Sequence, residues 1–154
     1  MTRDELPRLR TVADYQFGAG AGRALFPPDE APTVTRSTSG RPRQVRVDAG
    51  RLVSYGTDGR FTLGLEGGRR LVDALPDPEA RVVVGSESEP FVRDGKNVFA
   101  KFVRAVDDDV RPRDEVAVVH DDGDLLAVGR AELAADAMRD FETGMAVKVR
   151  AGAD

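Results

Sequence analysis

Hydrophobic residues near the start of the chain recur at the spacing of a helix. They are Leu6, Leu9, Val12 and Ala13. This spacing predicts a helix over residues 3–15. Thr2 and Glu5 hold the two positions of a capping box at its start. Residues 27–42 contain four prolines and Gly40, so we expect a loop there.

Further along, hydrophobic and polar residues alternate in short runs separated by turns. The runs cover residues 44–47, 51–55 and 61–65, and an Asp-Gly pair between the last two favours a hairpin turn. The pattern predicts a three-stranded antiparallel meander. Together with the first helix it makes a small α+β domain, which we expect to span residues 1–79.

The second half of the chain changes to many short strands with single-turn helices between them. Residues 81–84 include three consecutive valines, which predicts a strand buried on both faces, at the seam between two domains. Other strands are expected at 97–106, 115–119, 125–131 and 146–150, and short helices at 67–75, 86–93 and 134–141. This pattern indicates a small closed β-structure over residues 80–154.

Composition excludes several classes of protein. The 154 residues include no cysteine and one histidine, His120, which excludes disulfides, thiolate zinc sites and sites built on several histidines. The start of the chain has no apolar leader segment, and no run reaches the ~18 apolar residues of a membrane span. We therefore expect a cytoplasmic protein without membrane contact, metal or cofactor.

The charged residues are strongly biased. The chain has 20 Arg against 3 Lys and 18 Asp against 9 Glu, which indicates a GC-rich genome and a salt-adapted, halophilic protein. A net charge of −4 argues against nucleic-acid binding unless basic residues cluster locally. One cluster lies in the stretch 36–51, where a single acid, Asp48, accompanies five arginines: Arg36, Arg41, Arg43, Arg46 and Arg51.

Four motifs in the second half have a characteristic order and spacing. They are Phe91-Val92-x-x-Gly95-x-x-Val98-Phe99, Arg113-Asp114-Glu115-Val116, Leu126-Ala127-Val128-Gly129-Arg130-Ala131 and Gly144-x-Ala146-Val147. This order resembles the PUA domain, which pseudouridine synthases and archaeosine transglycosylases share. The resemblance implies an α+β chain in which the small N-terminal domain is followed by a PUA-type β pseudo-barrel with short helices.

Two further segments narrow the resemblance to one branch. They are Val98-Phe99-Ala100-Lys101-Phe102-Val103 and, in the first domain, Arg8-x-Arg10-x-x-Ala13-Asp14-Tyr15-Gln16-Phe17-Gly18. Both are similar to the C-terminal domains of archaeal tRNA-guanine transglycosylases. Those enzymes also carry a catalytic barrel and a Cys/His zinc site, whereas this chain has no cysteine and is too short for a barrel of about 250 residues. The resemblance therefore implies tRNA binding without base exchange.

Nine residues are candidates for contact with RNA. They are Lys96, Asn97, Lys101, Arg130, Lys148, Arg150, Arg41, Arg43 and Arg46. The first three surround Gly95, where family members hold RNA, and Lys is suited to phosphate contacts. The alternative is that these charges are only solvated or form ion pairs, as Arg130 would with Glu132 or Asp136.

Other residues favour structural interpretations. We expect Phe91 and Phe99 in the core, and leave open whether Phe102 stacks on bases. The acidic runs 107–109 and 121–124 are typical of turns, and the glycines of 18–22 lack the spacing of a nucleotide-binding loop. His120 has no nucleophile or orienting partner nearby in the sequence, so we expect no catalytic site.

The sequence leaves several functions open. The leading hypothesis is a non-catalytic RNA-binding protein that binds tRNA in the archaeosine pathway of tRNA modification. The alternative is an accessory subunit that docks on a tRNA-modifying enzyme and binds little RNA itself. An interaction module that uses the PUA surface for protein is also compatible with the sequence, and an enzyme in its own right is disfavoured.

Overall fold

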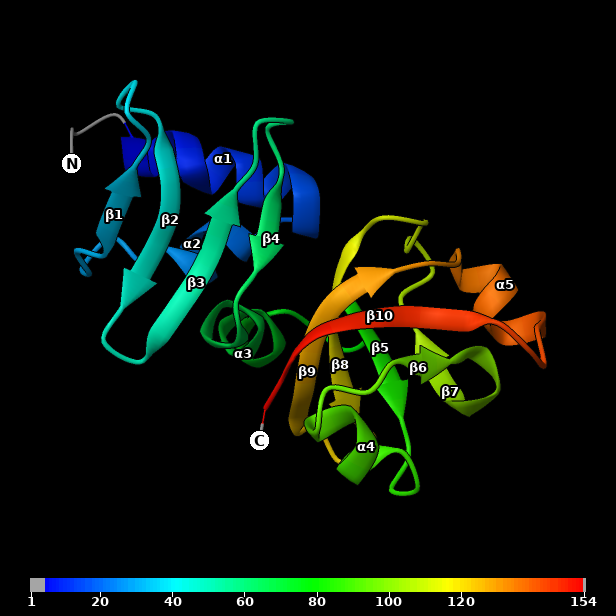
Figure 1. Ribbon diagram of the computed structural model, residues 1–154. Coiled ribbons are helices and arrows are strands. Elements are labelled where there is room, and N and C mark those ends of the chain that lie inside the picture. Colours follow the sequence, from blue (N-terminus) through cyan, green and yellow to red (C-terminus); the bar gives the residue numbers. More distant parts are fainter. Residues whose placement is uncertain (1–4, 154) are drawn as a thin grey trace.

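The structure, a computed structural model, describes residues 5–153. It contains an antiparallel sheet and a mixed sheet, which lie side by side (Figure 1). Thr2 of the expected capping box lies outside the described residues. The first sheet has four strands and the second has six. The expected α+β class is confirmed.

The first sheet and three helices make up the N-terminal part. Its elements are α1 (Glu5–Phe17), α2 (Ala21–Leu25), β1 (Thr33–Arg36), β2 (Pro42–Val47), β3 (Gly50–Tyr55), β4 (Phe61–Leu63) and α3 (Leu65–Ala74). The strand order is β1-β2-β3-β4, antiparallel throughout. The three-stranded meander is confirmed, but its third strand was expected over 61–65 and ends at Leu63, because Leu65 begins α3. The prediction of a loop over residues 27–42 is wrong in part, because β1 forms within it and pairs with β2.

The helices cover one face of the first sheet. Leu9, Ala13 and Phe17 recur every four residues along α1 and are buried against it. The opposite face stays open and carries polar side chains at paired positions. Gln44, Ser54 and Thr62 are aligned across β2, β3 and β4 on that face, because side chains alternate between the two faces of a strand.

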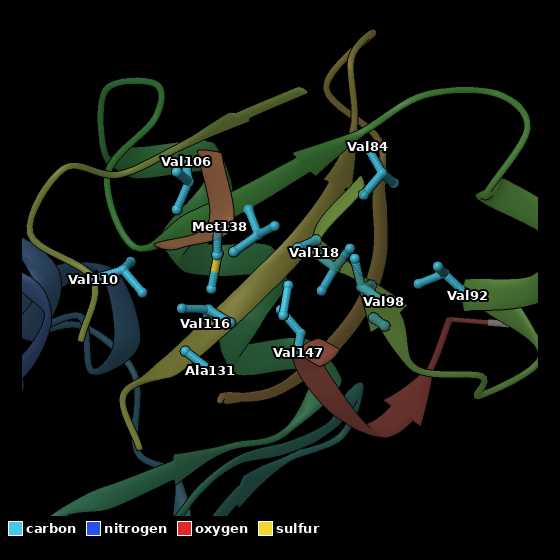
Figure 2. Packing of buried hydrophobic residues seen from close by; sticks show 14 of the residues in the cluster. Val84, Val92, Val98, Val106, Val110, Val116, Val118, Ala131, Met138 and Val147 are labelled. Atoms are coloured by element: carbon cyan, nitrogen blue, oxygen red, sulfur yellow. The ribbon is translucent and has the colours of Figure 1, made fainter. Parts of the chain in front are cut away.

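The second sheet closes almost fully into a pseudo-barrel. Its elements are β5 (Arg81–Val84), α4 (Glu89–Arg93), β6 (Val98–Phe99), the 3-10 turn η1 (Ala100–Phe102), β7 (Val103–Val106), β8 (Glu115–His120), β9 (Leu125–Ala131), α5 (Ala135–Asp140) and β10 (Met145–Gly152). The strand order is β6-β10-β9-β8-β5-β7, with only β5 and β8 parallel among the described pairs. Figure 2 shows how Met138 of α5 and valines from several strands fill its centre.

The prediction of one long strand over residues 97–106 is wrong. The turn η1 interrupts it, so that β6 pairs with β10 while β7 pairs with β5. The break carries the chain from one side of the pseudo-barrel to the other. It also leaves β6 and η1 beside α4, and side chains from all three elements line one hollow on the surface.

The strand β5 is the seam between the two cores, as predicted. All four residues are buried. Val82 and Val84 belong to the pseudo-barrel core, whereas Val83 packs in a cluster with Leu65 and Val72 of α3. Buried Arg81 donates from Nη2 to the carbonyl oxygen of Leu75, 2.8 Å away, and so ties the strand to the end of α3. The helix α3 lies between the two sheets (Figure 1).

Candidate nucleic-acid interface

The loop around Gly95 is fixed by the end of helix α4. The N–H of Gly95 donates to the carbonyl oxygen of Val92, and the N–H of Lys96 donates to that of Phe91, both at 2.9 Å. These two bonds form a Schellman motif, which needs a left-handed residue after the helix. Gly95 supplies it with φ of 93°. The expected C-terminal stop is therefore present, and it places Lys96 at the surface.

Phe91 and Phe99 lie on the surface, so their expected core positions are wrong. Phe91 is 62% exposed and Phe99 is 46% exposed, whereas their neighbours Val92 and Val98 are buried. Phe91 and Val92 are consecutive residues of helix α4, and Val98 and Phe99 are consecutive residues of strand β6, so each pair points in two different directions. Because successive side chains of a strand point to opposite faces, Val98 and Phe99 cannot both lie in the core, but the sequence does not show which of the two points inward.

These phenylalanines line a hollow of about 530 Å³, which we call the aromatic hollow. The surface that faces the hollow is almost entirely apolar, even where polar residues contribute to it. The lining residues are Glu87, Ser88, Phe91, Val92, Lys96, Asn97, Val98, Phe99 and Phe102. The one carboxylate, Glu87, lies 3.3 Å from the guanidinium of Arg104. A hydrogen bond to its own backbone N–H and the charge of Arg104 lower the pKa of Glu87, so it stays ionised and compensated.

The three candidates beside Gly95 have different surroundings. Lys96 is exposed on the wall of the aromatic hollow. The ammonium of Lys101 lies 5.1 Å from the ring centroid of Phe102, in a cation–π contact. The side-chain oxygen of Asn97 accepts a hydrogen bond from the N–H of Val149 at 2.9 Å, so Asn97 also fixes β10 against the loop.

The candidates on the last two strands form a second group. Lys148 of β10 and Arg130 of β9 are directly opposite in register, and both are exposed. Arg130 forms the ion pair with Glu132 that the sequence offered as its alternative, with 3.0 Å between Nη2 and Oε1. Arg150 turns toward the first sheet and pairs with buried Glu115.

The five arginines of the stretch 36–51 do not act as one cluster. Arg36 forms a bidentate pair with Glu5, at 2.6 Å for each bond. Arg41 stacks on the Tyr55 ring, 4.8 Å from its centroid, and donates to the carbonyls of Tyr55 and Gly56. Arg43 and Arg46 are exposed and form no hydrogen bond or ion pair through their side chains with residues 5–153.

The remaining member, Arg51, joins a different neighbourhood. It is opposite Arg46 in register, and its guanidinium donates to Ser54 Oγ at 2.8 Å. Its Nη2 lies 3.3 Å from the carbonyl oxygen of Leu63, at the edge facing the second sheet. The structure thus brings Arg46 and Arg51 toward Arg150, and leaves Arg41 and Arg43 at the other end of β2.

His120 has a serine partner that sequence reasoning missed. Its Nε2 lies 2.8 Å from Ser86 Oγ, and its Nδ1 lies 3.0 Å from the N–H of Asp122. Nδ1 also lies 3.1 Å from a carboxylate oxygen of Asp121 and 3.0 Å from one of Asp122. The contact between His120 and Ser86 links β8 to the loop before α4.

Two wider features of the described residues bear on the site. Among residues 5–153, no three histidine or acidic side chains converge in a way that would hold a metal ion. Within the same range, every helix is too short or too polar to cross a membrane.

Comparison with known families assigns both parts of the chain. Residues 7–78 match the patch-forming domain C2 of tRNA-guanine transglycosylase, and residues 80–153 match the PUA domain. The tRNA-guanine(15) transglycosylase of Thermococcus kodakarensis is 47% identical over 95% of this chain and 25% of its own length. That of Methanothermobacter thermautotrophicus is 45% identical over 98% of this chain and 23% of its own length.

Solved structures support the same fold. A hypothetical protein from Pyrococcus horikoshii superposes with a TM-score of 0.73 at 20% identity, over 99% of this chain and 92% of its own. A conserved PUA domain protein from Thermoplasma acidophilum gives 0.72 at 20% identity, over 99% and 91%. The chain spans about a quarter of the length of the transglycosylases it matches. It combines their C2 and PUA domains and is homologous to the C-terminal region of archaeal tRNA-guanine transglycosylase.

Proposed function

We propose that this protein binds tRNA in connection with tRNA modification, and that the aromatic hollow is where it holds the RNA. The observation that carries the proposal is the exposure of Phe91 and Phe99 beside Lys96. Two large aromatic side chains on the surface of a small protein, next to two of its three lysines, are unusual without a ligand.

The chemistry of the hollow fits unpaired nucleobases. Each base presents a flat π-face, and stacking on an aromatic side chain contributes about 1–3 kcal/mol per base. Lys96 and Lys101 supply mobile positive charges at the edge of the hollow, where the phosphates of a stacked strand would lie. We place single-stranded RNA here, as at the end or in a loop of a tRNA.

The role we propose is non-catalytic. The site offers stacking and charge, but the residues around it supply no activated nucleophile. The archaeosine pathway and a cytoplasmic location are part of the proposal, supported by homology to tRNA-guanine(15) transglycosylases. An accessory subunit that docks on a tRNA-modifying enzyme is the alternative, and it predicts that RNA binding by this chain is weak and insensitive to the hollow.

A substitution of Phe91 tests the proposal. We expect Phe91→Ala to weaken tRNA binding at least fivefold, because it removes one stacking face. The matched control is Phe141→Ala, since Phe141 is 49% exposed but lies at the end of α5 and does not line the hollow. Fluorescence anisotropy with labelled tRNA measures both. Equal affinity for the two variants and the unchanged protein would overturn the proposal.

A further inference from the structure

Two arginines from the two sheets meet at one carbonyl oxygen. Arg51 of β3 and Arg150 of β10 both donate through Nη2 to the carbonyl oxygen of Leu63, at 3.3 and 2.6 Å. Leu63 ends β4, the strand of the first sheet that approaches β8 and β9. Each domain therefore contributes one guanidinium to the same point at the junction.

Positive charge is in excess at this point. One carboxylate, Glu115, faces the two guanidiniums. It accepts hydrogen bonds from Nη1 and Nη2 of Arg150, at 3.1 and 2.5 Å, and from the N–H of Leu63 at 2.8 Å. Burial, followed by the charges of Arg150 and Arg46, lowers the pKa of Arg51, with Glu115 acting in the opposite direction. An anion that binds beside Arg51 would stabilise the charged form of its guanidinium, which burial and the neighbouring arginines disfavour.

The excess continues along β10. Lys148 is exposed, and its side chain has no ion pair or hydrogen bond to any residue between 5 and 153. It lines a hollow of about 320 Å³ together with Thr62, Glu115, Arg130, Val149 and Arg150. We call Arg46, Arg51, Arg150 and Lys148 the junction stripe. In a protein with net charge −4, these four basic residues gather near one buried acid, Glu115.

The junction stripe differs chemically from the aromatic hollow. No aromatic side chain lines the hollow beside Lys148, and Thr62 supplies a hydroxyl. Guanidinium, ammonium and hydroxyl groups contact phosphates and riboses, which an RNA helix displays while its bases are paired and stacked. We infer that the junction stripe, to which both domains contribute residues, binds the phosphodiester backbone of an RNA helix.

The inference rests on the proposed function, because it places two contacts on one RNA. Asn97, beside the aromatic hollow, bonds to the backbone of Val149, the residue after Lys148. The two surfaces are thus neighbours on β10. A single RNA with a helix and an unpaired segment can contact both at once.

A blunt RNA duplex of about twelve base pairs isolates the junction stripe, because it offers no unpaired base. Arg46→Gln and Lys148→Gln remove one exposed charge from each domain without breaking a contact. We expect each to weaken duplex binding about threefold to tenfold and to lower the slope of log affinity against log salt by about one. Arg23→Gln is the control, because Arg23 is exposed on α2, on the covered face of the first sheet.

Two probes separate this inference from the proposed function. If Arg46→Gln and Lys148→Gln bind the duplex with the affinity and salt slope of the unchanged protein, the inference is overturned, even where Phe91→Ala weakens binding of a single-stranded oligonucleotide. If the stripe variants weaken duplex binding while Phe91→Ala changes nothing, the stripe stands and the aromatic hollow fails. No binding of either probe at any salt at which the protein is folded overturns both.

Discussion

At the scale of single residues, the candidate site depends on which of two neighbouring hydrophobic side chains points outward. Val92 and Val98 are buried, whereas Phe91 and Phe99 beside them are exposed. The buried valines anchor α4 and β6 in the pseudo-barrel core. That anchoring holds the two rings outward at the water boundary, where they remain free to contact a ligand.

This orientation predicts an inverted order of stability effects. Val98→Ala should lower the free energy of unfolding by roughly 2 kcal/mol, because it leaves a cavity in a packed core. Phe99→Ala removes a larger side chain but should cost less than about 1 kcal/mol, because much of that side chain is already in water. Urea denaturation measures both. A greater loss for Phe99→Ala would place its ring in the core.

The sequence placed Lys96 and Lys101 around the Gly95 loop, where both are exposed, and misplaced the rings of Phe91 and Phe99 in the core. The glycine stop after α4 could be read from the sequence, because a left-handed cap has a residue signature. A hydrophobic residue gives no such sign of its direction when both neighbours are also hydrophobic. The nine candidate RNA contacts stay predictions, although the structure groups six of them on α4's loop, η1, β9 and β10.

At the scale of elements, hydrophobic patterning predicts strands and helices but not their pairing. Hydrophobic patterning located most strands, including β5 and β8 from their continuous apolar runs, yet it does not encode that these two run parallel. It also joined β6 to β7, because the turn η1 contains Ala100 and Phe102, which continue the apolar pattern. Pairing is settled by contacts between residues far apart in the chain.

Helix α3 gives a prediction at this scale. Gly67 lies in its first turns, and a Cβ there would overlap the carbonyl oxygen of Leu52. In a free helix, Gly→Ala stabilises by about 1 kcal/mol. Here we expect Gly67→Ala to lower the midpoint of thermal unfolding, because β3 and α3 must separate. A raised midpoint in calorimetry would show that the helix is not held this closely.

At the scale of the whole molecule, one buried carboxylate links the two sheets. Glu115 of β8 accepts from the backbone of Leu63 in β4 and pairs with Arg150 of β10. These residues are distant in sequence, so no local pattern could have predicted their meeting. The domain boundary between residues 79 and 80 stays a prediction, and the matched ranges 7–78 and 80–153 support it.

Removing that carboxylate should weaken the whole fold. Glu115→Ala leaves Arg150 without its partner and Leu63 without its acceptor, so we expect a loss of about 3 kcal/mol or more. Glu132→Ala is the control, because the pair of Glu132 with Arg130 is more exposed and should contribute less than about 1 kcal/mol. Equal effects in denaturant titrations would mean that the Glu115 link does not hold the sheets together.

The central claim is that RNA lies across the aromatic hollow. Ultraviolet crosslinking of the protein to total cellular RNA, followed by identification of both the crosslinked peptide and the RNA, tests it directly. We expect tRNA to be recovered, with crosslinks on the segment that carries Phe91, Phe99 and Phe102. Recovery of no tRNA, or crosslinks confined to the helical face of the first domain, would contradict it.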